Sequence, residues 1–238
     1  MPDTSNIIAR LRLQLEDSAN EKTRLSSERF FREEVNIYGL KTADAMRISK
    51  EFFMEIKSSS KHEILNLCEE LWLSGYIEES LIACNWAYNL RNQYQPEDFE
   101  TFERWVKNYV SNWASCDTLC NHTIGIFIMQ YPNFVNQLKD WTTSSNRWVR
   151  RASAVSFIIP ARKGKFTSDI FTIAEALLMD KDDMVQKGYG WLLKVTSQVH
   201  LQLVFDFVMS NKSFMPRTAL RYAIEKLPSG LKAQVMAK

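Results

Sequence analysis

Residues 184–196 read MVQKGYGWLLKVT. Apolar residues in this stretch recur at spacings of three and four, which is the spacing of one face of an α-helix. Similar spacing continues along the chain in both directions, and almost no segment shows the strict alternation of a half-buried strand. Seven glycines and six prolines among 238 residues are too few for the turns of a many-stranded protein. The sequence therefore predicts an all-α protein.

The helices that this spacing predicts are short and closely spaced, with stops at Gly39, Pro96, Pro132 and Pro228. About thirteen helices of roughly three turns each are expected, over 7–15, 28–37, 43–56, 62–72, 77–91, 97–110, 115–131, 134–141, 147–158, 168–179, 184–196, 201–209 and 217–226.

Four tryptophans mark a repeat. Trp72, Trp113, Trp148 and Trp191 lie 41, 35 and 43 residues apart. Paired helices with a period near 40 residues are typical of HEAT-like or armadillo-like solenoids, which present a concave face. We therefore predict a single HEAT-like repeat domain over residues 1–238. Each tryptophan taken alone is more typical of a packed core than of a site.

Charge is distributed unevenly. Residues 1–118 carry 14 Lys or Arg against 20 Asp or Glu, whereas residues 119–238 carry 16 against 8. The basic second half favours a polyanionic partner, most simply nucleic acid on a basic concave face, and a solvated basic face without a partner is the alternative.

Several classes of protein are excluded by composition. The longest apolar runs, such as 126–129, fall far short of the roughly 20 residues of a membrane helix, and the start of the chain has no export signal. We expect a cytoplasmic protein without a membrane partner, in which the four cysteines are reduced.

Residues 160–166, PARKGKF, combine turn formers with the cations Arg162, Lys163 and Lys165. This composition predicts an exposed basic loop or a short hairpin that could contact phosphates.

The segments NWASCD (112–117), NRWVRRA (146–152), VQKGYGWLLK (185–194) and MPRTALRYAIE (215–225) form an ordered set, preceded by FFR (30–32) and YGLKT (38–42). Together they resemble the AlkD-type DNA alkylation repair glycosylases over nearly the whole chain.

The resemblance implies a solenoid that wraps duplex DNA and removes cationic N3- or N7-alkylated purines without extruding the base. It implies a site at Trp113, Asp117 and Trp191, with Arg151 contacting the DNA backbone. We also expect a monomer that needs no cofactor.

The chemistry of the reaction agrees with those residue types. Breaking an N-glycosidic bond develops positive charge on the sugar, which a fixed carboxylate stabilises. An alkylated purine is already a cationic leaving group, so one carboxylate suffices. Trp113 and Asp117 are four residues apart and would share one helical face, while Trp191 would supply a second indole wall. Without the resemblance, Asp117 could equally be a helix-terminal or ion-paired carboxylate.

Cations surround these residues. Lys187, Trp191 and Lys194 form one helical stripe, which suits phosphate contact beside a stacked ring or a merely solvated face. Arg150 and Arg151 point about 100° apart, so one of them lies on a given face. Arg147 extends the same polarity.

Three positions depart from the family pattern. Lys194 stands where arginine is usual, Phe30 stands where a lesion-contacting tyrosine is usual, and Asn112 replaces a tryptophan. Some paralogues lack base excision and bind branched DNA through a basic hairpin, so a non-catalytic binding module is the second hypothesis and a protein-interaction scaffold the third.

No metal site is expected, because Cys116 and His122 would point about 240° apart on a continuous helix.

Overall fold

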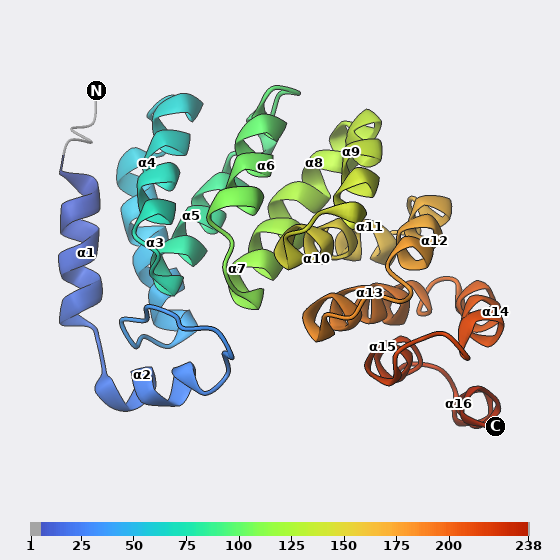
Figure 1. Ribbon diagram of the computed structural model, residues 1–238. Helices are drawn as coiled ribbons and strands as arrows, with labels where there is room; N and C mark the ends of the chain where they lie inside the picture. The colour runs from blue at the N-terminus through green and yellow to red at the C-terminus, as the bar shows by residue number, and fades with distance from the viewer. Residues whose placement is uncertain (1–5, 238) are drawn as a thin grey trace. The chain divides into compact units, whose positions relative to one another are not determined.

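The computed structural model describes residues 6–237, and these residues are mainly helical (Figure 1). In this part of the chain there is no β-strand, only an isolated β-bridge between Asn36 and Tyr76. The all-α prediction is confirmed. The α-helices are α1 (Ile7–Asp17), α2 (Glu21–Glu28), α3 (Thr42–Ile56), α4 (Lys61–Leu73), α5 (Ile77–Asn89), α6 (Asp98–Asn108), α7 (Trp113–Thr118), α8 (Gly125–Gln130), α9 (Val135–Asp140), α10 (Arg147–Val155), α11 (Ile158–Arg162), α12 (Thr167–Ala176), α13 (Asp183–Thr196), α14 (Leu201–Asn211), α15 (Arg217–Ala223) and α16 (Ser229–Met236).

The chain forms two compact units with a boundary between Leu119 and Cys120. This boundary nearly coincides with the change in charge, since the first unit holds the acidic excess and the second the basic excess. None of the described helices is both long enough and apolar enough to span a membrane.

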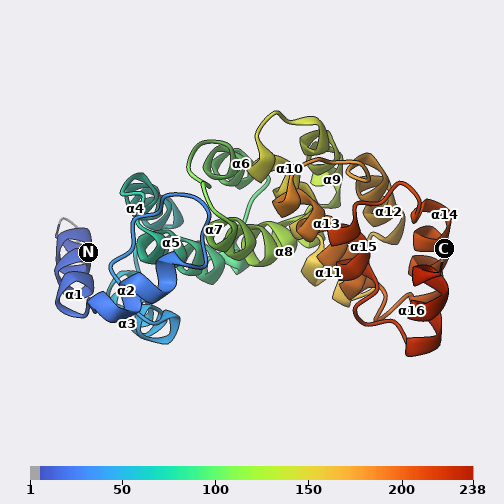
Figure 2. The same ribbon diagram turned by 60° about the horizontal axis from the view of Figure 1, so that its bottom comes forward.

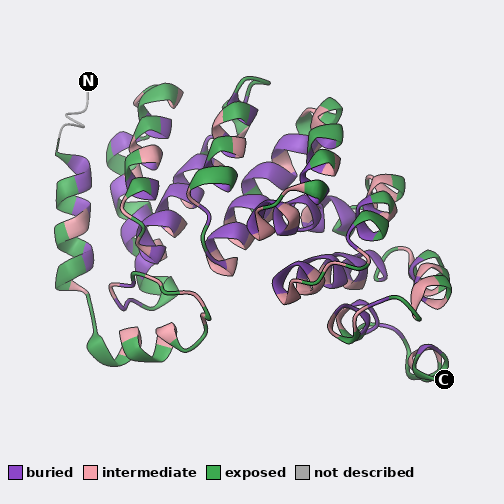
Figure 3. Cartoon of the chain, viewed as in Figure 1, coloured by how far each residue is buried: buried purple, intermediate pink, exposed green. Residues whose placement is uncertain are grey.

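In the first unit, α5 is the central helix. It packs against α3, α4 and α7, and α1 packs against α3 and α4 (Figures 1 and 2). Trp86 on α5 is fully buried together with Phe102 and Trp105 on α6. Figure 3 shows the resulting pattern, in which α3, α4 and α5 contain buried residues, whereas α2 contains none.

In the second unit, α13 takes the central place and packs against α10, α11, α12 and α15. Contact between α13 and α15 requires a glycine at position 190. A Cβ atom there would lie 2.7 Å from the Tyr222 Cβ and 2.9 Å from the Ala219 carbonyl oxygen. Next to Gly190, Tyr189 is fully buried and its hydroxyl donates to the Leu178 carbonyl at 2.8 Å.

The predicted helix over 28–37 is wrong. The helix in this region is α2, which begins earlier because the Asn20 side chain accepts the Thr23 N–H at 3.0 Å, and ends at Glu28. The chain from residue 29 to 41 is not helical. Gly39 has a φ of +102°, a left-handed conformation that interrupts any helix.

Other helices also differ from the prediction. The helix expected over 115–131 is divided into α7, a π-helical turn (Leu119–Ile124) and α8. The helix expected over 147–158 ends at Val155, and α11 follows with Pro160 in its first turn, where a missing N–H is tolerated. Helix α16 was not predicted, although it begins directly after Pro228.

The segment predicted as an exposed loop or hairpin is partly helical. Pro160 and Ala161 are buried in α11, so the hairpin is wrong. The chain then turns through Gly164 and Phe166, both with positive φ, and leaves Arg162, Lys163 and Lys165 exposed.

The close approach of α13 and α15 predicts the effect of one methyl group. Gly190→Ala would force a Cβ into the backbone of α15, so we expect the free energy of unfolding to fall by about 1–3 kcal/mol. Gly230→Ala in α16 is the control, because its added Cβ meets no atom within 4 Å. Urea unfolding of both variants measures the difference, and equal stabilities would contradict the packing argument.

Candidate active site

Helix α7 places Trp113 and Asp117. Its N-cap is Asn112, whose buried side-chain oxygen accepts the Ser115 N–H at 3.0 Å. Asn112 thus has a structural function here, since it satisfies one of the free N–H groups at the start of the helix. Trp113 and Asp117 are one turn apart on this helix, and both are half-buried.

The Trp113 ring is fixed by the segment that precedes α3. Its indole N–H donates to the Phe30 carbonyl at 3.3 Å, and its ring stacks on Phe31 with centroids 5.5 Å apart and planes 18° apart. Phe30 itself is 72% exposed. The structure therefore brings together two of the predicted site residues, Phe30 and Trp113, and adds Phe31.

These aromatic residues border a mainly apolar cavity of about 340 Å³ within the first unit. The other residues that line it come from α2, α3, α5, α7 and the segment between α2 and α3, namely Ser27, Ile37, Leu40, Thr42, Ala45, Ile77, Glu78, Leu81 and Ala114. Asp117 is not in its wall, although it lies one turn along α7 from Trp113 and Ala114.

A buried carboxylate, that of Glu78, binds the non-helical segment between α2 and α3, which lines part of this cavity. Glu78, in the first turn of α5, is 3% exposed. Its carboxylate oxygens accept the backbone N–H groups of Tyr38 at 3.1 Å, Gly39 at 2.9 Å and Leu40 at 3.1 Å. Sequence reasoning missed this residue, because its partners lie about 40 positions away and are backbone groups.

The neighbouring Glu79 is fully buried and binds the Tyr38 side chain, not the backbone of the segment. It accepts the Tyr38 hydroxyl at 2.7 Å and pairs with the Arg12 guanidinium at 3.1 Å. Burial raises the pKa of the Tyr38 hydroxyl well above its ordinary value, and the hydrogen bond to Glu79 raises this pKa further. The pKa of Arg12 is also raised by its hydrogen bond to Glu79.

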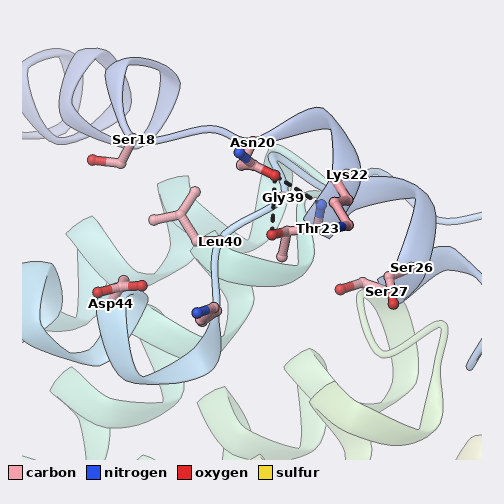
Figure 4. A pocket seen from close by; sticks show the side chains of 10 residues that line it. Ser18, Asn20, Lys22, Thr23, Ser26, Ser27, Gly39, Leu40 and Asp44 are labelled. Atoms are coloured by element: carbon pink, nitrogen blue, oxygen red, sulfur yellow. Dashed lines mark hydrogen bonds between the residues drawn. The ribbon is translucent and has the colours of Figure 1, made fainter.

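A second, polar pocket of about 570 Å³ opens next to the apolar cavity and shares Ser27 and Leu40 with it (Figure 4). Its lining contains four hydroxyl side chains, Asn20 and Asp44, together with Lys22 and Lys41. Hydroxyl and ammonium groups can donate to phosphate or sugar oxygens, so this pocket could contact a nucleic-acid backbone.

Trp191 lies in the second unit, on α13, and is half-buried. The two lysines of its stripe are both ion-paired. Lys187 Nζ lies 3.2 Å from Asp183, and Lys194 Nζ lies 2.9 Å from Glu225 and over the Tyr222 ring. The convergence of Trp191 with Trp113 and Asp117 stays a prediction.

The arginines of α10 are held by the residues that lead into α13. Arg150 pairs with Asp180 at 2.6 Å, and Arg147 pairs with Asp182 at 3.3 Å. Arg151 is 5% exposed and donates to the Met184 carbonyl. Contact of these three arginines with DNA stays a prediction, as it does for the exposed Arg162, Lys163 and Lys165.

Within residues 6–237, no group of three or more His, Cys, Asp or Glu side chains could hold a metal ion.

Comparison with known proteins shows which family the sequence matches. A family model described as "DNA alkylation repair enzyme" matches residues 11–227. Among solved structures, the chain is similar to "Predicted DNA alkylation repair enzyme from Enterococcus faecalis", with a TM-score of 0.79 and 16% sequence identity over 89% of this chain and 98% of that chain. At this identity the likeness shows the helical repeat fold. No curated protein matches the chain.

The raised pKa of Tyr38 predicts how its contribution to stability depends on pH. At pH 7, Tyr38→Phe is expected to cost about 1.5–3 kcal/mol, because it removes a hydrogen bond to a buried carboxylate. Above pH 10 the unfolded tyrosine loses its proton while the folded Tyr38 retains its own, so wild-type stability falls with pH. The difference between the two proteins in urea unfolding should therefore shrink from pH 9 to pH 11, and a constant difference would contradict the prediction.

Proposed function

The chain belongs to the DNA alkylation repair enzyme family, and we propose that it is a DNA glycosylase that hydrolyses the N-glycosidic bond of cationic N3- or N7-alkylated purines in duplex DNA. The observation that carries this proposal is the aromatic wall formed by Phe30, Phe31 and Trp113, because Trp113 lies on α7, one helical turn from Asp117.

The aromatic wall suits a damaged base. The Trp113 ring is held by a stack and a hydrogen bond, so it is ordered before any ligand arrives. An electron-rich indole face attracts a cationic ring, and this attraction strengthens where water is excluded. Phe30 is exposed and can cover apolar surface of the nucleotide, although it lacks the hydroxyl of a tyrosine.

Asp117 is the proposed catalytic carboxylate. As the bond between C1′ and the purine nitrogen breaks, its electron pair goes to the base, which leaves neutral, and positive charge develops on the sugar. A carboxylate beside C1′ stabilises that charge and accepts a hydrogen bond from the attacking water, which then loses a proton. No general acid is needed, because the purine is already cationic.

Affinity for DNA is proposed to come mainly from the second unit, which has the basic excess. Arg162, Lys163 and Lys165 are exposed on and after α11, where they can contact phosphates. Arg147, Arg150, Arg151, Lys187 and Lys194 are proposed as further contacts, and Trp191 as an aromatic contact to the damaged nucleotide. The ion-paired cations among them would exchange a carboxylate for a phosphate.

A second candidate function is a binding module of the same family that recognises branched or distorted DNA without cutting a glycosidic bond. The exposed cations at Arg162, Lys163 and Lys165 favour it, because a dense cluster of charge suits closely spaced phosphates. Absence of base release by the wild-type protein, together with tighter binding to a four-way junction than to a methylated duplex, would support this function and reject the glycosylase.

Asp117→Asn tests the glycosylase directly. The substitution keeps the size of the side chain and removes its charge, so we expect release of methylated purines from duplex DNA to slow by about 100-fold or more. Asp17→Asn changes an exposed aspartate of the same unit and is the control. Release of free base is followed by chromatography, and an unchanged rate in Asp117→Asn would reject the catalytic assignment.

The salt dependence of binding tests the phosphate contacts. Arg162→Gln with Lys163→Gln should reduce the slope of log K against log salt concentration by about 2, because each lost phosphate contact reduces the slope by about 1. Lys50→Gln with Lys57→Gln removes the same charge from exposed positions of the acidic unit and should leave the slope unchanged. Equal slopes for the two double variants would contradict this assignment.

A further inference from the structure

Residues 29–41 form the part of the candidate site that has no helix or strand to hold it. Two of its residues, Phe30 and Phe31, meet Trp113. A non-helical segment cannot satisfy its own N–H groups, so whatever accepts them determines its path. The Phe30 and Phe31 N–H groups each donate at 3.0 Å to carbonyls at the end of α2, those of Ser27 and Glu28, and the later part of the segment is held by its contacts with α5. The position of the aromatic wall thus depends on both ends of the segment.

The contacts with α5 concentrate on its first turn. The Ile77 N–H donates to the Asn36 carbonyl at 2.9 Å, which is part of the isolated bridge. The Glu78 carboxylate accepts three consecutive N–H groups further along the segment, those of Tyr38, Gly39 and Leu40. The carboxylate is a negative charge at a helix N-terminus, where it is favoured by the helix dipole, and it is shielded from water.

On the side away from Glu78, the segment packs closely against the start of α2 at Gly39. A Cβ atom there would lie 2.5 Å from the Asn20 carbonyl oxygen and 2.9 Å from the Arg24 Cβ. The segment thus lies between the start of α2 and the Glu78 carboxylate. Loss of the carboxylate acceptors would release it on one side only, towards the cavity that Ile37 and Leu40 line together with Trp113.

We propose that Glu78 is a positioning residue for the aromatic wall. Its carboxylate fixes the backbone of residues 38–40 and so holds Phe30 and Phe31 against Trp113, in the geometry that receives the damaged base. The inference rests on the proposed glycosylase function. Glu78 itself does not act on the substrate, because both of its oxygens are occupied by backbone N–H groups.

Glu78→Gln is the test, and Glu79→Gln is the matched control. The glutamine retains one acceptor oxygen but turns an NH₂ group towards a backbone donor and removes the charge. Glu79 is adjacent, equally buried and also bound to Tyr38, but through its side chain and with Arg12. Unlike Glu78, it does not line the cavity. Both variants lose a buried carboxylate, so a merely structural effect would be similar in the two.

The first readout is single-turnover release of methylated purine. Partial unfolding lowers the amplitude, whereas displacement of the wall lowers the rate constant. Because a misplacement of about 1 Å can cost about 100-fold in rate, we expect Glu78→Gln to slow release by about 10- to 100-fold at unchanged amplitude. Glu79→Gln should retain the wild-type rate constant. Equal rate constants for the two variants would overturn the proposal.

The second readout does not depend on activity. In protein labelled with 5-fluorotryptophan, the Trp113 signal is one of seven ¹⁹F resonances and is identified by its loss in Trp113→Phe. We expect Glu78→Gln to shift this resonance, and Glu79→Gln to leave it in place. An unshifted Trp113 resonance in Glu78→Gln would overturn the proposal.

The two readouts separate this proposal from the function on which it rests. A wild-type protein that releases no base would reject the glycosylase, while the ¹⁹F shift would still decide whether Glu78 positions the wall. If Glu78→Gln does not fold, Glu78→Asp keeps the charge but withdraws the carboxylate by one methylene, and the same shift of Trp113 and loss of rate are expected.

Discussion

Two consecutive carboxylates, Glu78 and Glu79, are buried at the start of α5, and the first unit is organised around the way they are satisfied. Burying an ionised carboxylate costs several kcal/mol unless its oxygens are hydrogen-bonded. Glu78 is satisfied by three backbone N–H groups, and Glu79 by Arg12 and the Tyr38 hydroxyl. Glu78 binds the backbone of residues 38–40, whereas Glu79 binds only the Tyr38 side chain and Arg12. The path of this irregular segment past Trp113 is therefore set by the way in which one buried carboxylate, that of Glu78, is satisfied.

The sequence predicted those elements that local interactions determine. The expected helix over 184–196 agrees with α13 (Asp183–Thr196), and that over 43–56 agrees with α3 (Thr42–Ile56). Each has an apolar face that its own residues define, and α13 also has a capping aspartate, Asp182, which accepts two N–H groups of the first turn. Trp113 and Asp117 could likewise be placed one turn apart, since a single helix contains both.

Non-local contacts explain what the sequence could not predict. Phe30, Phe31 and Ile37 have a spacing that a helix would allow, yet the chain from 29 to 41 is irregular. The N–H groups of its residues 38–40 bind a carboxylate about 40 residues away instead of the carbonyls of a helix. The stack of Phe31 on Trp113 joins positions 82 residues apart, and no local spacing encodes it. Phe31 was adjacent to a predicted site residue in the sequence, but only the path of the backbone shows that it is Phe31 whose ring meets the indole.

In the second unit, too, the sequence could not predict which charged residues pair with one another. Counting residues gave the basic excess correctly, but it could not show that Asp180, Asp182 and Asp183 lie against Arg150, Arg147 and Lys187. A cation that already has a carboxylate partner is held in one orientation, so less side-chain entropy is lost when a phosphate replaces that carboxylate. The exchange also returns a carboxylate to water near a phosphate, which reduces the net gain. In the proposed DNA complex, paired cations would therefore contribute orientation more than affinity, and exposed cations such as Lys163 and Lys165 would contribute affinity more than orientation.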